Sequence, residues 1–255
     1  MKVTFIGAGN LATRLALEMQ KAGITIHQIY SRTLQSGEIL ALKLGCPYTD
    51  SIEQILPDAD LYVFSLKDAV LDKIISQMVP NGGLWVHTAG SIPMSVFEGY
   101  ASRYGVLYPL QTFSKEREVV FSRIPFFIEA NNEEDVVFLA SVAALLTSQV
   151  KVLPSAKRKM LHLAAVFACN FTNHMYALAA RIVEEQDLPF DYLLPLIDET
   201  AAKVHFMLPS QAQTGPAIRY DQNVIQKHQE MLSEEDMQML YEQISKSIYK
   251  EASRK

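Results

Sequence analysis

The sequence predicts an α/β fold: a doubly wound, mostly parallel sheet of about eight strands, with a second domain that is all helical. Over residues 1–154, short apolar runs alternate with segments of helical periodicity, which is typical of a parallel sheet covered by helices on both faces. Beyond Pro154 no convincing strand follows. We therefore predict one domain over residues 1–154 and a second over residues 155–255.

The composition narrows the classes of partner. A length of 255 residues with 49% apolar residues is enough for one or two ordinary cores. The net charge of -5 argues against nucleic acid or an anionic membrane as the main partner. No secretion signal and no apolar run of about 18 residues is evident, so we expect a cytoplasmic protein. The two cysteines, Cys46 and Cys169, support neither a disulfide framework nor a metal site, and we expect both to be small buried residues.

The first turn of the chain carries the strongest motif. An apolar strand over Val3–Ile6 leads into Gly7-Ala8-Gly9-Asn10-Leu11-Ala12, and a helix follows to Ala22. A G-x-G-x-x-A turn between a strand and a helix predicts a dinucleotide-binding βαβ unit, the start of a Rossmann fold. The alternative is a structural turn that merely contains glycines. The second strand predicted over Ile24–Ile29 argues against it.

Each small residue of this turn has an expected role. Gly7 lets the chain turn tightly, Gly9 lets backbone N–H groups approach a pyrophosphate, and Ala12 allows the helix to pack closely on the sheet. The helix N-terminus then presents unpaired N–H groups and the positive end of its dipole to the anion.

The end of the second strand predicts which dinucleotide binds. An Asp or Glu here would select NAD through the ribose 2′-hydroxyl. Instead Ser31 and Thr33 offer hydroxyl groups, and Arg32 offers a guanidinium suited to a 2′-phosphate. We therefore expect NADP, against the alternative of a solvated arginine in a surface turn.

The remaining elements of this domain follow in order. We expect a helix over Leu34–Leu44 closed by Gly45, a strand over Pro47–Thr49, a turn at Asp50–Glu53 resembling a capping box, a helix over Glu133–Thr147, and strands over Leu61–Ser65, Leu84–Thr88, Gly105–Phe113, Ile124–Glu129 and Gln149–Leu153.

Ligands of such sheets bind outside the carboxyl ends of the strands. Ser65 and Lys67 stand at such an end and are candidates to line the cofactor groove. Lys67 could equally belong to a solvated helix start, and that alternative stays open. The predicted cofactor-binding residues are Gly7, Ala8, Gly9, Asn10, Leu11, Ser31, Arg32, Thr33, Ser65, Leu66, Lys67, Thr88, Ala89 and Gly90. His87 also ends a strand, but we favour a core histidine over an acid/base group because no catalytic partner stands near it in the sequence.

The second domain begins with a long helix. It is expected from Ser155, as N-cap, to about Gln186. Residues 160–180 are apolar on nearly every face, so the helix needs burial on all sides and predicts a homodimer. We further expect a helix over Asp191–Leu208 bent near Pro195, a loop over Pro209–Arg219, helices capped by Asp221 and by Ser233–Asp236, and a fraying tail from Lys246.

Polar residues interrupt this long helix. Lys159, His162, Asn170 and Asn173 follow helical steps and share one stripe. Two interpretations stay open: a hydrogen-bonded structural network, or contacts to substrate and cofactor.

Five segments together resemble a known family: residues 7–12, His87-Thr88-Ala89-Gly90, Pro109–Phe113, His162–Phe171 and Thr214–Arg219. They look like the signatures of NADP oxidoreductases in which a Rossmann domain precedes a helical domain of uncharacterised function. The domain order is similar to that of pyrroline-5-carboxylate reductase and deazaflavin-dependent NADP oxidoreductase. The resemblance covers the whole chain and implies the architecture and the cofactor, not a substrate.

Departures from related families narrow the activity. The chain lacks the S-G-S-G-P-A segment of pyrroline-5-carboxylate reductases, so proline synthesis is not expected. Leu163 stands where β-hydroxyacid dehydrogenases carry an Asn one turn after their Lys. Tyr220 follows Arg219 where the resembling family usually has Gly.

These observations predict an oxidoreductase that transfers hydride between NADP(H) and a small carbonyl or imine substrate, in a cleft between the domains. His162 is expected to supply the proton, Asn170 to orient the substrate, and Arg219 to bind a substrate carboxylate. No metal is expected. Two alternatives stay open: an NADP-binding sensor without turnover, and a reductase whose hydride partner is a flavin or deazaflavin.

Overall fold

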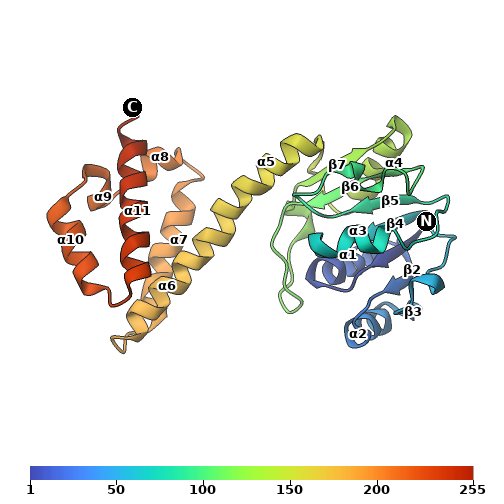
Figure 1. The fold of residues 1–255 in the computed structure, drawn as a ribbon, viewed down its shortest axis with the longest axis horizontal. Coiled ribbons are helices and arrows are strands. Elements are labelled where there is room, and N and C mark those ends of the chain that lie inside the picture. The colour runs from blue at the N-terminus through green and yellow to red at the C-terminus, as the bar shows by residue number, and fades with distance from the viewer. Residues whose placement is uncertain (255) are drawn as a thin grey trace. The chain divides into compact units, whose positions relative to one another are not determined.

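The fold is an eight-stranded sheet with helices on both faces, followed by a set of helices (Figure 1). The computed structural model describes residues 1–254. The strand order is β3-β2-β1-β4-β5-β6-β7-β8, and every neighbouring pair is parallel except β6 and β7. The strands are β1 Lys2–Ile6, β2 Thr25–Tyr30, β3 Tyr48–Thr49, β4 Leu61–Phe64, β5 Leu84–His87, β6 Tyr104–Pro109, β7 Phe126–Ala130 and β8 Val150–Val152. The predicted doubly wound sheet is confirmed.

Two hydrophobic cores lie on opposite faces of the sheet. Because alternate side chains of a strand point to opposite faces, Phe5 enters one core and Ile6 the other. Helices α1 (Asn10–Lys21), α2 (Leu34–Leu44) and α4 (Glu133–Ala144) cover the first face, and α3 (Asp68–Ile75) covers the second. Gly45 ends α2 in the left-handed conformation with φ 65°, as its sequence position predicts.

The chain forms two compact units, residues 1–174 and residues 175–255. Helix α5 (Ser155–Ala165), which follows the predicted boundary at residue 154, belongs to the first unit. A buried ion pair attaches it there: Arg158 Nη1 lies 2.7 Å from Glu129 Oε2 on β7. Ser155 is not the N-cap, because Pro154 takes that position and the Ser155 hydroxyl instead donates to Glu129, at 2.5 Å.

The helices of the C-terminal region differ in detail from the expectation. They are α6 Thr172–Glu184, α7 Leu194–Lys203, α8 Pro209–Ala212, α9 Pro216–Arg219, α10 Gln222–Met231 and α11 Glu235–Ala252. Pro195 lies in the first turn of α7 and bends nothing, because a proline there removes no intrahelical hydrogen bond. The expected loop over residues 209–219 contains two short helices, and the tail stays helical to Ala252. No helix within residues 1–254 is long and apolar enough to cross a membrane.

Among the caps, Asp221 behaves as predicted, since its side chain accepts from the Val224 N–H. The segment Ser233–Asp236 does not cap the last helix through a side chain, and Glu234 precedes it instead. At the turn predicted to resemble a capping box, the Ser51 hydroxyl donates to the Glu53 carboxylate. Ser51 precedes only a short 3₁₀ helix, Ile52–Gln54.

The long helical stretch is not covered within the chain. Met160 is 64% exposed and Phe167 63% exposed, and Leu163 and Phe171 are also exposed. Cys169 is exposed as well, so the expectation of a buried cysteine is wrong there. The sequence predicted burial of this stretch in a homodimer rather than by the chain alone, and that burial stays a prediction.

His87 is a core residue, which is the interpretation the sequence favoured. Its side chain is fully buried, and its Nδ1 accepts from the Ala89 N–H at 3.1 Å. Burial, together with the charge of nearby Arg158, lowers the pKa of His87 to about 3. The imidazole is therefore neutral at ordinary pH and holds the turn after β5 in place.

Candidate functional site

A cavity of about 380 Å³ lies where the strand order reverses, at the carboxyl ends of β1 and β4. This reversal is where open α/β sheets bind ligands. Its lining residues are Gly7, Ala8, Gly9, Asn10, Tyr30, Ser31, Arg32, Thr33, Ser36, Ser65, Leu66, Lys67, Val70, Ile74 and Lys115. We call this space the switch-point cavity.

The conformation of Gly7 is required by the fold itself. Its φ is +119°, and a Cβ here would stand 2.3 Å from the Ser65 carbonyl oxygen. Its N–H donates to the Tyr30 carbonyl oxygen at 2.7 Å. Three strand ends, β1, β2 and β4, therefore meet at one residue that can carry no side chain.

Gly9 is different, because nothing in the chain demands a glycine there. Its φ is -77°, which any residue adopts, and no atom lies within 4 Å of the position of a Cβ. It precedes α1, whose first N–H groups have no intrahelical partner. The space over Gly9 thus fits a group from outside the chain, and the diphosphate of a dinucleotide suits the exposed N–H groups.

The lining of the switch-point cavity is basic. Arg32, Lys67 and Lys115 line it together with no carboxylate. Ser31 is buried and its hydroxyl donates to the Thr33 carbonyl oxygen at 3.1 Å, which fixes the turn that presents Arg32. Asp50 and Glu53 line a neighbouring cavity that shares Arg32. The lining favours an anionic ligand.

Most predicted cofactor residues gather here, but four do not. Leu11, Thr88, Ala89 and Gly90 are absent from the lining of the switch-point cavity. Five lining residues were missed by the sequence analysis: Tyr30, Ser36, Val70, Ile74 and Lys115. Ser36 stands three residues after Thr33 on the same helix and could have been found. Lys115 could not, because it comes from a loop distant in sequence.

A second cavity, of about 400 Å³, contains the candidate catalytic side chains. His162 and Asn170 line it, together with Tyr108, Gln111 and Cys169. The Tyr108 hydroxyl and His162 Nδ1 are 3.0 Å apart, in hydrogen-bond contact. We call this space the His162 cavity. Tyr108, at the end of β6, was missed because its partner lies 54 residues away.

The turn after β5 packs directly on His162. A Cβ on Gly90 would stand 2.5 Å from the His162 ring, so this glycine is needed for the contact. The segment Thr88–Gly90, predicted to bind the cofactor, thus packs on the histidine instead through Gly90, and Thr88 is buried.

Arg158, one helical turn before His162, fixes the position of α5 on the sheet. Besides the Glu129 ion pair, Arg158 donates from Nη2 to the Ile92 carbonyl oxygen at 2.5 Å and is fully buried. The arginine therefore ties β7, the turn after β5 and α5 together. Burial raises the pKa of Tyr108, while the Arg158 charge opposes that rise. The phenol stays protonated at neutral pH.

A π-helical segment, Val166–Phe171, follows α5. The Thr172 hydroxyl donates to the Phe167 carbonyl oxygen at 3.1 Å, across the widened turn. Such segments are frequent at functional sites, and this one brings Cys169 and Asn170 to the His162 cavity. Lys159, Asn170 and Asn173 are exposed, and both interpretations of the polar stripe, a structural network or contacts to substrate and cofactor, stay open.

Arg219 belongs to the other compact unit, as the exposed last residue of α9, and its role stays a prediction. Tyr220, next to it, adopts φ 51°, a left-handed conformation that explains why a glycine suits this position. Within residues 1–254, no three or more His, Cys, Asp or Glu side chains gather as metal ligands would.

Comparison with known proteins agrees with this geometry. Residues 2–88 match the family described as NADP oxidoreductase coenzyme F420-dependent, and residues 124–248 match a domain of unknown function, DUF2520. The crystal structure of a "putative NADP oxidoreductase" from Bacteroides fragilis is 54% identical, with a TM-score of 0.92 over 98% of each chain.

Two more distant proteins are similar to the chain, one in fold and one in part of its sequence. A reductive aminase from Aspergillus terreus, in complex with NADPH and ethyl levulinate, is 17% identical with a TM-score of 0.74, over 98% of this chain and 94% of that one. Pyrroline-5-carboxylate reductase 3 of Mus musculus is 27% identical over 103 residues. That match spans only 38% of this chain and 38% of the mouse protein.

The two glycines can be distinguished by experiment. Gly7→Ala should lower the free energy of unfolding by about 1–3 kcal/mol, because the new Cβ meets backbone and a strained φ. Gly9→Ala should change it by less than about 0.5 kcal/mol, yet weaken NADPH binding by at least about tenfold. Denaturant unfolding and calorimetric titration measure the two effects. Undiminished NADPH affinity in Gly9→Ala would contradict the placement of the diphosphate over Gly9.

Proposed function

Because the chain belongs to the NADP oxidoreductase family, we propose that it transfers hydride between NADP(H) and a small carbonyl or imine substrate. NADP is its cofactor, and the nicotinamide supplies the hydride when bound. The observation that carries this proposal is the switch-point cavity. Its glycine turn at Gly7 and Gly9 and its basic lining suit a phosphorylated dinucleotide. The substrate class is supported by the reductive aminase from Aspergillus terreus, which shares the fold and was solved with NADPH and ethyl levulinate.

The direct test follows NADPH absorbance during a screen of imines, ketones and 2-keto acids. Turnover of at least one class supports the proposal. Oxidation of NADPH only with added flavin or deazaflavin would favour the alternative hydride partner. Tight NADPH binding without any turnover would favour a sensor and contradict the proposal.

Within the cavity, Arg32 is proposed to bind the ribose 2′-phosphate, supported by the hydroxyl groups of Thr33 and Ser36 nearby. A guanidinium can donate two parallel hydrogen bonds to a phosphate, which a hydroxyl-bearing ribose does not offer.

Arg32→Gln should therefore weaken NADPH binding by about 10–100-fold and leave NADH binding nearly unchanged. Titration with both nucleotides gives the two affinities. Lys43→Gln is the matched control, since Lys43 is an exposed cation on α2, the helix that follows Arg32, and does not line the cavity. Equal losses for NADPH and NADH would exclude a 2′-phosphate contact.

His162 is proposed as the proton donor to the oxygen or nitrogen that the substrate carries. In the imidazolium form both ring nitrogens bear protons. Nδ1–H then donates to the Tyr108 oxygen, and Nε2–H is the proton transferred. After transfer the imidazole is neutral, keeps its proton on Nδ1 and still donates from there to the Tyr108 oxygen. Tyr108 thus orients the ring in both states, Asn170 is proposed to orient the substrate, and Arg219 to bind its carboxylate.

His162→Gln should lower kcat by about 100-fold or more, because general acid catalysis contributes on that scale. Tyr108→Phe should lower kcat less and alter its pH profile, since the ring loses its orienting partner. Asn170→Ala and Arg219→Met should mainly raise KM. NADPH affinity, measured by titration, should stay unchanged in Tyr108→Phe. Unchanged turnover in His162→Gln would remove the proton-donor role.

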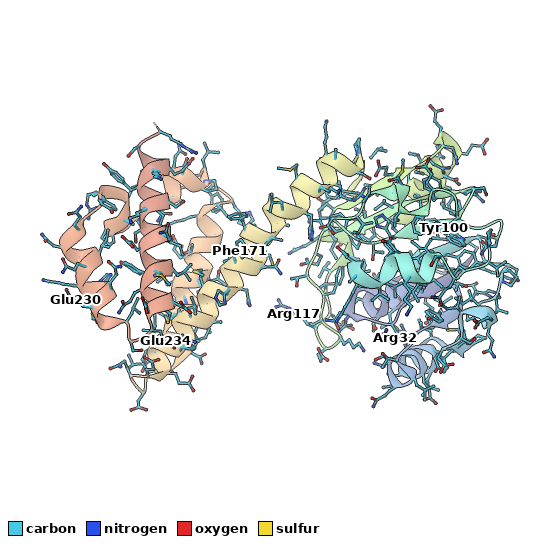
Figure 2. The ribbon with its side chains drawn as sticks, in the orientation of Figure 1. Arg32, Tyr100, Arg117, Phe171, Glu230 and Glu234 are labelled. Carbon is cyan, nitrogen blue, oxygen red and sulfur yellow. The ribbon has the colours of Figure 1, made fainter. Side chains whose placement is uncertain are left out.

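We also propose that two copies of the chain form a homodimer through the exposed stripe of Met160, Leu163, Phe167 and Phe171 (Figure 2 labels Phe171). The Phe167 and Phe171 rings are 4.9 Å apart and form a continuous apolar surface. Such a stripe is costly to leave in water.

Sedimentation velocity should therefore give the mass of a dimer, and Phe167→Glu should shift it to a monomer, because a carboxylate would be desolvated in the interface. Val79→Glu is the control, because Val79 is 75% exposed and lies outside the stripe. A wild-type monomer would contradict the homodimer.

A further inference from the structure

We propose that Lys115 is a phosphate ligand of the bound dinucleotide, supplied by the loop after β6 and positioned by Arg14. The inference rests on the proposed dinucleotide site, to which it adds a residue distant in sequence. The loop comprises residues 110–120, between β6 and the short 3₁₀ helix Phe121–Arg123.

Side chains of α1 hold this loop through its backbone. Asn10 Nδ2 donates to the Phe113 carbonyl oxygen at 3.0 Å. Arg14 donates from Nε to the Ser114 carbonyl oxygen at 3.1 Å, and from Nη2 to that of Lys115 at 2.6 Å. Three consecutive carbonyl groups of the loop are thus fixed to the helix whose N-terminus faces the switch-point cavity.

Further contacts keep the loop in this position. The Arg14 side chain is only 12% exposed and also lies 3.9 Å from Glu118. The Phe113 ring packs against Phe121, with ring centroids 6.0 Å apart, and Phe121 is buried in the main core. Because both the core and α1 hold the loop, the position of Lys115 relative to α1 is determined.

The Lys115 side chain lines the switch-point cavity, with Gly9, Asn10 and Arg32. Among the residues the structure describes, its ammonium group forms no ion pair within 4.0 Å. An unpaired cation beside the open N-terminus of a helix of 12 residues is suited to an anionic oxygen. In this cavity, the anionic oxygen that would contact the Lys115 ammonium group belongs to a phosphate group of the bound cofactor.

Arg117 provides a comparison on the same loop. It has the same charge and stands two residues later, but lines a different cavity with Gln111, Arg123 and Glu118. Figure 2 labels Arg117 on this loop and Arg32 at the end of β2. A general attraction of the basic loop for nucleotides would involve both cations, whereas a specific phosphate contact involves Lys115 alone.

The test compares Lys115→Gln and Arg117→Gln by calorimetric titration of the full chain with NADPH and NADH. Lys115→Gln should weaken NADPH binding about tenfold and Arg117→Gln less than about twofold. Lys115→Arg should restore most of the affinity. An equal loss for both nucleotides identifies the diphosphate as the ligand, and a loss for NADPH alone identifies the 2′-phosphate.

Arg14→Gln tests the positioning role. It should weaken NADPH binding by itself but add little in the Lys115→Gln background, since both changes remove the same contact. Thermal unfolding of Lys115→Gln without nucleotide should match that of the wild type. Wild-type affinity in Lys115→Gln, or an equal loss in Arg117→Gln, would overturn the inference while leaving the proposed function intact. Failure of the wild type to bind either nucleotide would overturn both.

Discussion

The close approach of β1 to β4 at Gly7 is the constraint on which the rest of the first unit depends. With a Cβ position only 2.3 Å from the Ser65 carbonyl oxygen, the two strand ends can meet only through a residue without a side chain. The contact sets where the strand order reverses and therefore where a ligand cavity forms. It also directs the N-terminus of α1 into that cavity. Cofactor binding follows from a backbone packing requirement.

A second constraint acts on the other cavity. The fully buried Arg158 joins β7, the turn after β5 and the start of α5 through Glu129 and Ile92. A buried ion pair of this kind is a weak source of net stability, but it permits few alternative registers. The register it holds places His162 beside Tyr108 and over Gly90. The candidate proton donor is thus positioned by charges that do not take part in the chemistry.

The π segment and the exposed stripe lie on one helical stretch, residues 155–171. One side carries His162 and Asn170 to the His162 cavity, where the widened turn changes which side chains face it. Met160, Leu163 and Phe167 are exposed and apolar. The same stretch that lines a candidate active site therefore also offers the surface proposed for a second copy.

By itself, the sequence determined the order of the strands along the chain, the glycine turn and the basic residue after β2. Those features are local: periodicity, a turn motif and the absence of an acid are visible within a few residues of each other. Other predictions were wrong, such as a bend at Pro195, which lies in the first turn of α7, and a buried Cys169, which is exposed, because a local pattern fixes neither where a helix starts nor what packs against a residue. Only the tertiary structure decided that Tyr108 contacts His162 and that Lys115 lines the same cavity as the glycine turn. Contacts between residues 54 and about 100 positions apart depend on strand order and loop anchoring, which no local pattern encodes.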